Sequence, residues 1–69
     1  MITPLIKKMC STLKEAGVDL DTNLAIYFMT KDNEPGMKEL LKFVEANNPT
    51  PREILEKTFQ IFWEFKAKN

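Results

Sequence analysis

The sequence contains no histidine and only one cysteine, Cys10, among its 69 residues. Histidine is the side chain best suited to proton transfer near neutral pH, and it is the commonest ligand of transition metals. The hydroxyls of Ser11 and Thr12 therefore have no imidazole that could activate them as nucleophiles. A single cysteine cannot form an internal disulfide, and we expect Cys10 to be a core residue. The sequence thus favours a non-enzymatic protein without catalytic residues, metal or cofactor.

Neither sign of charge is in excess, because ten basic residues balance ten acidic ones. Proteins that bind phosphate backbones or anionic lipid usually carry an excess of positive charge. No apolar run is long enough to span a bilayer, and the first ten residues lack the basic-then-apolar order of a signal peptide. We therefore expect a soluble cytoplasmic chain with no membrane partner and no small-molecule substrate, and nucleic acid is disfavoured.

The chain is too short for more than one domain, which we expect to span residues 1–69. Its 43% hydrophobic and 29% charged residues are ordinary for a globular protein. A chain of this length buries only about 60% of the surface of its unfolded state. Association with another chain is therefore an attractive way to complete its core.

Capping residues predict an all-α bundle of four short helices, at about 4–16, 22–30, 35–47 and 51–66. Thr3 followed by Pro4 is typical of a helix start, and Gly17 of a helix end. Asn33 can cap the third helix. Thr50 and Glu53 form a capping box before the fourth helix.

The second predicted helix could instead be a strand, because the residues from Leu24 to Met29 are apolar without a break. Isoleucine, tyrosine and phenylalanine also favour strands, so a strand is the alternative here. We favour a helix, since a lone strand would leave its backbone groups unpaired. A helix that is apolar all round should be covered on most sides. Asp19, Asp21 and Asn23 have the spacing of a calcium loop, but the glycine and glutamate of such loops are missing, so we interpret them as capping residues.

The stretch FQIFWEF, residues 59–65, places four aromatic rings in the fourth helix. A helical wheel puts one stripe of side chains toward the core. This stripe comprises Ile54, Thr58, Ile61, Phe62 and Phe65. Trp63 lies about 100° from the stripe. Either Trp63 covers the rim of the bundle, or Trp63 and Phe59, with Phe43 at the edge of the third helix, form a contact surface for a protein partner.

We therefore expect a small protein-protein interaction module whose partner is another protein or a second copy of itself. Nine lysines against one arginine suit an AT-rich genome, and hence an adaptor or inhibitor of bacterial or phage type. The alternative is a helix-turn-helix-like DNA-binding or transcription-accessory protein. In that case residues 33–36 would enter a groove and a face of lysines would contact phosphates. The lysines available for such a face are Lys7, Lys8, Lys14, Lys31, Lys38 and Lys42.

Overall fold

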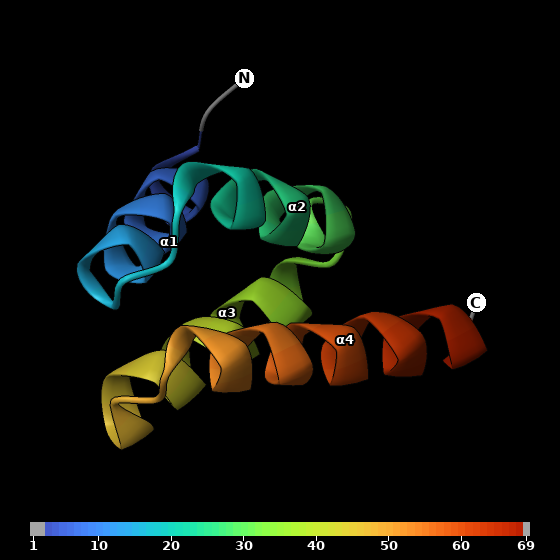
Figure 1. Ribbon diagram of the computed structural model, residues 1–69. Coiled ribbons are helices and arrows are strands. Elements are labelled where there is room, and N and C mark those ends of the chain that lie inside the picture. Colours follow the sequence, from blue (N-terminus) through green and yellow to red (C-terminus); the bar gives the residue numbers. More distant parts are fainter. Residues whose placement is uncertain (1–2, 69) are drawn as a thin grey trace.

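Four helices make up the computed structural model, which describes residues 3–68. They are α1 (Pro4–Glu15), α2 (Leu20–Thr30), α3 (Glu34–Asn47) and α4 (Pro51–Lys68). No strand occurs in the described part of the chain, and residues 24–29 are helical, so the predicted all-α bundle is confirmed and the strand alternative is wrong. In Figure 1, α1 and α2 form the upper half of the molecule, and α3 and α4 form the lower half.

The predicted caps hold three of the four helix starts. The Thr3 hydroxyl accepts the N–H of Ile6 at 3.2 Å, and the Asn33 side chain accepts the N–H of Gly36 at 3.1 Å. In the capping box before α4, Thr50 donates its N–H to the Glu53 carboxylate at 2.8 Å, and the Thr50 hydroxyl accepts the N–H of Glu53 at 3.2 Å. Each bond satisfies a backbone N–H at the start of a helix, where no carbonyl of the same helix can accept it.

The start of α2 lies two residues earlier than predicted. The Asp19 carboxylate accepts the N–H of Thr22 at 2.8 Å, so Asp19 is the cap and Leu20 is already helical. At the other end of the connection, Gly17 has a φ of +93°, a backbone conformation that glycine adopts without strain. This confirms Gly17 as the residue that ends the α1 region and turns the chain toward α2.

All four helices, and the α1–α2 connection, contribute to one buried core. α2 packs against α1 and α4, and α3 packs against the same two helices. Buried threonines fit into this core because each hydroxyl donates to its own helix: Thr30 to the Ile26 carbonyl and Thr58 to the Ile54 carbonyl, both at 2.8 Å. The buried apolar residues are Met9, Leu13, Val18, Ile26, Met37, Leu40, Leu41, Val44, Ile54 and Ile61.

Three residues that we expected in the core are only half-buried: Cys10, Phe62 and Phe65. Figure 1 shows the reason for the two phenylalanines, because the C-terminal end of α4 extends past the other helices. There the ring of Phe62 packs instead against Trp63, with centroids 5.7 Å apart, and under the Lys66 ammonium at 5.4 Å. Of the five residues predicted for the core stripe of α4, Ile54, Thr58 and Ile61 are buried.

Candidate interaction surface

Among residues 3–68, five large apolar side chains are exposed to solvent. On α2 the exposed fractions are 73% for Leu20, 48% for Leu24 and 62% for Phe28, and on α4 they are 46% for Phe59 and 66% for Trp63. Together these side chains expose on the order of 500 Å². The largest apolar patch on a typical monomer is about 300–600 Å² and is often functional. We refer to these five residues as the α2–α4 apolar face.

The α2 part of this face is a straight stripe. Leu20, Leu24 and Phe28 are spaced four residues apart, so they follow one another along one side of the helix. The side of α2 that faces the core instead carries Asn23, Ile26 and Thr30, which are buried. Our expectation that this helix would be covered on most sides is therefore wrong within a single chain. The core has room for only one side of α2.

The α4 part of the face lies on the flank of α4 that is turned away from α3. Lys57 marks the α3 flank, because its ammonium lies 3.0 Å from the Glu39 carboxylate and 5.6 Å from the centre of the Phe43 ring. Phe59 and Trp63 follow Lys57 by two and six residues, which places them about 120° to 160° away around the helix. Phe59 is therefore displaced toward the other flank of α4, and Trp63 lies beside it, nearly opposite the buried side chains Ile54 and Thr58.

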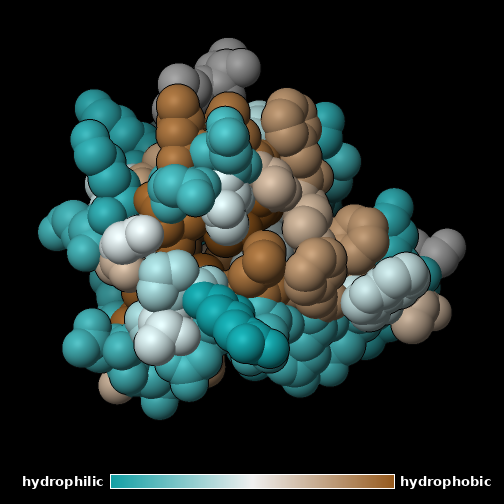
Figure 2. Space-filling model, viewed as in Figure 1, coloured by the Kyte–Doolittle hydropathy of each residue, from teal (hydrophilic) through white to brown (hydrophobic). Residues whose placement is uncertain are grey.

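This other flank is the one next to α2, since α2 and α3 both pack against α4. Figure 2 shows brown and tan atoms over α2 and down to the middle of α4, with teal atoms to the left and below. Apolar atoms of the two neighbouring helices thus gather on the side of the molecule that Figure 2 shows.

Charged groups stand at the two ends of the α2 stripe. Asp19 and Asp21 lie at the N-terminal end, and Lys31 follows the last residue of the helix. The Asp19 carboxylate accepts a hydrogen bond from the Thr22 backbone N–H and a further one from the Thr22 hydroxyl. These bonds hold the pKa of the Asp19 carboxyl below its ordinary value. The Lys31 ammonium lies 5.8 Å from the centre of the Phe28 ring. The stripe thus has Asp19 and Asp21 at one end, with Lys14 near Leu20, and Lys31 at the other end, with Asp32 directly after it.

Of the three residues predicted to contact a partner, Trp63 and Phe59 lie together on this face, whereas Phe43 does not. Phe43 is half-buried on α3, beneath Lys57, on the opposite flank of α4. Sequence reasoning missed the α2 contribution of Leu20, Leu24 and Phe28. The signal that could have found it was the continuous apolar character of residues 24–29, which is more than one side of a packed helix needs.

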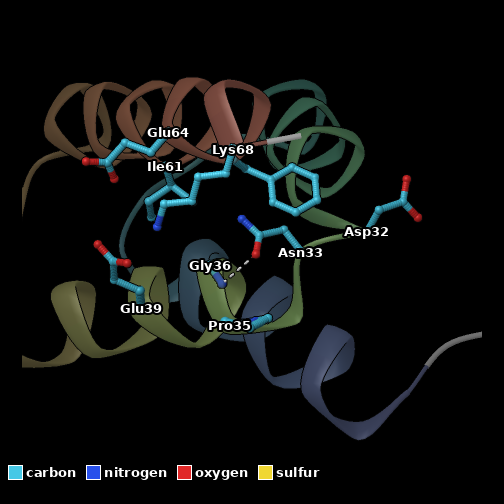
Figure 3. Close-up of a pocket in the computed structure, with 9 residues that line it drawn as sticks. Asp32, Asn33, Pro35, Gly36, Glu39, Ile61, Glu64 and Lys68 are labelled. Carbon is cyan, nitrogen blue, oxygen red and sulfur yellow. Dashed lines mark hydrogen bonds between the residues drawn. The ribbon is translucent and has the colours of Figure 1, made fainter.

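A second candidate is a surface pocket of about 370 Å³ between the start of α3 and the end of α4. Its polar groups do not converge on one point. Figure 3 shows Asp32 directed away from the pocket and the Asn33 amide turned to Gly36, to which it is hydrogen-bonded. Glu39 is already paired with Lys57. This pocket therefore offers less for a specific ligand than the α2–α4 apolar face offers for a protein.

The lysines considered for DNA binding lie on or next to helices that pack together. α1 and α3 are neighbours, and the Lys8 ammonium lies 3.7 Å from the Glu45 carboxylate across them. A carboxylate thus lies beside one of the lysines on this side. The first turn of α3, which would have to enter a groove, is covered in part by α4, because Gly36 and Met37 are buried and Gly36 lies against Ile61.

Residues 3–68 contain no group of three or more acidic or cysteine side chains placed to hold a metal ion. Within the same range, none of the helices has the length and apolar character needed to cross a bilayer. Comparisons of this chain with protein families, with curated proteins and with solved structures find no significant match.

Proposed function

We propose that this chain is a small non-enzymatic protein-protein interaction module that binds its partner through the α2–α4 apolar face. The observation that carries the proposal is the exposure of Leu20, Leu24 and Phe28 along one side of α2, and of Phe59 and Trp63 along the adjacent helix α4. Aromatic residues at the centre of an interface contribute most of its binding energy. An adaptor or inhibitor of bacterial or phage type, acting in the cytoplasm, suits a protein of this size and composition.

Trp63 provides the direct test, because it is the only tryptophan and its fluorescence reports its surroundings. In dilute solution its emission should be close to that of tryptophan in water, and it should shift to the blue when a partner covers the face. Trp63→Ala should change the free energy of unfolding by less than about 0.5 kcal/mol. The same substitution should weaken association by about 2 kcal/mol or more.

A capture experiment completes the test. The tagged chain should retain its partner from an extract of the cell that encodes it, and a Phe28→Ser/Trp63→Ala double variant should not. Gln60→Ala, an exposed substitution on another side of α4, is the matched control and should behave as the natural chain does. The proposal is wrong if Trp63 emits in the blue at every concentration and Trp63→Ala unfolds the protein. It is also wrong if the double variant binds as well as the natural chain.

The alternative function is a helix-turn-helix-like DNA-binding or transcription-accessory protein. The observation that favours it is the packing of α1 against α3, which the proposed lysine face requires. We rank it second because Glu45 lies beside Lys8 on that face and because the whole chain has no net charge. The salt dependence of DNA binding separates the two functions, as argued below.

A further inference from the structure

The α2 stripe has a pattern that fits a reversed copy of itself. Leu20 and Phe28 lie about 12 Å apart along the helix, with Leu24 at the midpoint. Asp21 and Lys31 lie about 15 Å apart, and their midpoint is within one turn of Leu24. The apolar stripe and the charges that bracket it are thus centred on nearly the same point. A pattern of this kind is required of a two-fold interface, in which the same surface contacts itself.

We propose that the occupant of the α2–α4 apolar face is a second copy of this chain, with the two α2 helices antiparallel across a two-fold axis near Leu24. In this arrangement Leu20 of each copy lies opposite Phe28 of the other. The Lys31 ammonium of each copy reaches the Asp21 carboxylate of the other. Side chains spaced four residues apart form the ridges by which helices commonly pack. This inference rests on the proposed function and names its partner.

The charges favour a copy of this chain over an unrelated helix. Antiparallel packing brings Asp21 at the start of one α2 helix near Lys31 at the end of the other, and it does so twice. The helix dipoles act in the same direction, because the N-terminus of each helix lies beside the C-terminus of the other. A parallel arrangement would instead place Lys31 beside Lys31. Since the net charge is zero, two copies also have no overall repulsion to overcome.

The area is consistent with a stable dimer. A standard interface buries about 800 Å² on each partner. The five apolar side chains supply on the order of 500 Å² of this, and the exposed residues around them, such as Asp21 and Ala25, form the rim. Phe59 and Trp63 then flank the paired α2 helices and exclude water from them.

Sedimentation velocity over a range of concentrations tests the dimer with the full chain. The natural chain should be a dimer at low micromolar concentration. Leu24→Glu should raise the dissociation constant by on the order of a hundredfold, because it places two carboxylates near the axis in an apolar interface. Gln60→Glu is the control, since it adds the same charge outside the proposed interface and should leave the dissociation constant unchanged. Circular dichroism should show both variants folded.

A charge exchange tests the antiparallel arrangement. Asp21→Lys and Lys31→Glu each bring like charges together in both ion-pair positions of the dimer. Each variant alone should dimerise about tenfold more weakly. An equimolar mixture of the two should regain the affinity of the natural chain, because every pair in the mixed dimer is again of opposite sign. Asp19 is left unchanged, since it caps α2.

A chain that remains monomeric at millimolar concentration overturns this inference, and so does a dimer that Leu24→Glu leaves intact. Failure of the mixture to recover overturns the antiparallel arrangement. These results differ from failure of the proposed function. A monomer that still captures a partner through Phe28 and Trp63 keeps the interaction module and loses only the second copy, whereas a face that binds nothing loses both.

Discussion

At Gly36, the first turn of α3 lies so close to α4 that a side chain has no space. A Cβ atom there would lie 2.6 Å from the Cγ2 of Ile61, and closer still to the Asn33 amide. Ile61 is a buried core residue, and Asn33 is held in place because it caps α3. A methyl group would therefore have to displace either the core or the cap.

We predict that Gly36→Ala destabilises the fold by about 1–3 kcal/mol through overpacking and damage to the cap. This is opposite in sign to the usual effect, since Gly→Ala within a helix ordinarily stabilises by about 0.5–1 kcal/mol. Urea unfolding measures the difference. Lys38→Ala, an exposed substitution on the same helix, is the control and should stay within about 0.5 kcal/mol of the natural chain. A more stable Gly36→Ala variant would contradict the close approach.

The exposure of a single residue could be predicted from the sequence only where its angle around its own helix determines that exposure. The wheel of α4 placed Trp63 outside the core, and the structure agrees, because the helical period alone fixes that angle. Whether Phe59 and Phe43 lie on one surface depends instead on which flank of α4 each neighbouring helix covers. No local pattern contains that information, and the two residues prove to lie on opposite flanks.

At the scale of the helices, the starts of α1, α3 and α4 could be predicted to within one residue because the capping bonds are local, whereas α4 ends at Lys68, two residues later than predicted. Thr3, Asn33 and the Thr50 capping box each act on a backbone N–H three residues away. The start of α2 was predicted less well, since three neighbouring side chains can all cap and only Asp19 does. The apolar run at residues 24–29 indicated that α2 has more apolar surface than one packed side needs, but an evenly apolar helix does not indicate which side it presents to the core.

Two of these caps make the stability depend on pH. The hydrogen bond from the Thr50 backbone N–H holds the pKa of the Glu53 carboxyl below its ordinary value, and a weaker effect of the Thr50 side chain adds to it. The backbone and side chain of Thr22 lower the pKa of Asp19 in the same way. A carboxyl with a lowered pKa in the folded state stabilises the fold at pH values above its unfolded pKa. That contribution is lost as the pH falls through the folded pKa.

We therefore predict that the thermal midpoint falls as the pH is lowered from about 5 to about 3. Glu53→Gln should reduce the steepness of this fall, because glutamine can still accept the Thr50 N–H but does not titrate. Far-UV circular dichroism over this pH range gives both curves. Glu64→Gln is the matched control, since it removes one carboxylate from the same helix but no capping bond. Equal slopes for Glu53→Gln and the natural chain would show that the capping box does not sense pH.

At the scale of the whole molecule, the surface divides into an apolar side and sides of mixed charge. Of the three ion pairs among the described residues, Lys8–Glu45 and Lys57–Glu39 lie away from the α2–α4 apolar face, whereas Arg52–Glu56 lies on the same side of α4 as Phe59 and Trp63. Pairs as exposed as Arg52–Glu56 contribute little to stability, but they neutralise the basic groups beside them. Together with the zero net charge of the chain, these pairs leave less unpaired basic charge for a phosphate backbone.

This distribution predicts that the chain shows no measurable binding to duplex DNA at physiological salt. If its lysines bind phosphates at all, the affinity should fall by about a thousandfold between 50 mM and 200 mM salt, because each phosphate contact releases counterions. Association through the apolar face should change far less over the same range. Fluorescence anisotropy of a labelled duplex and sedimentation of the chain alone, in matched buffers, measure the two side by side. A Lys38→Glu/Lys42→Glu variant controls for the lysine face. Nanomolar binding to one duplex sequence at physiological salt, lost in that variant, would make the DNA-binding alternative the better function.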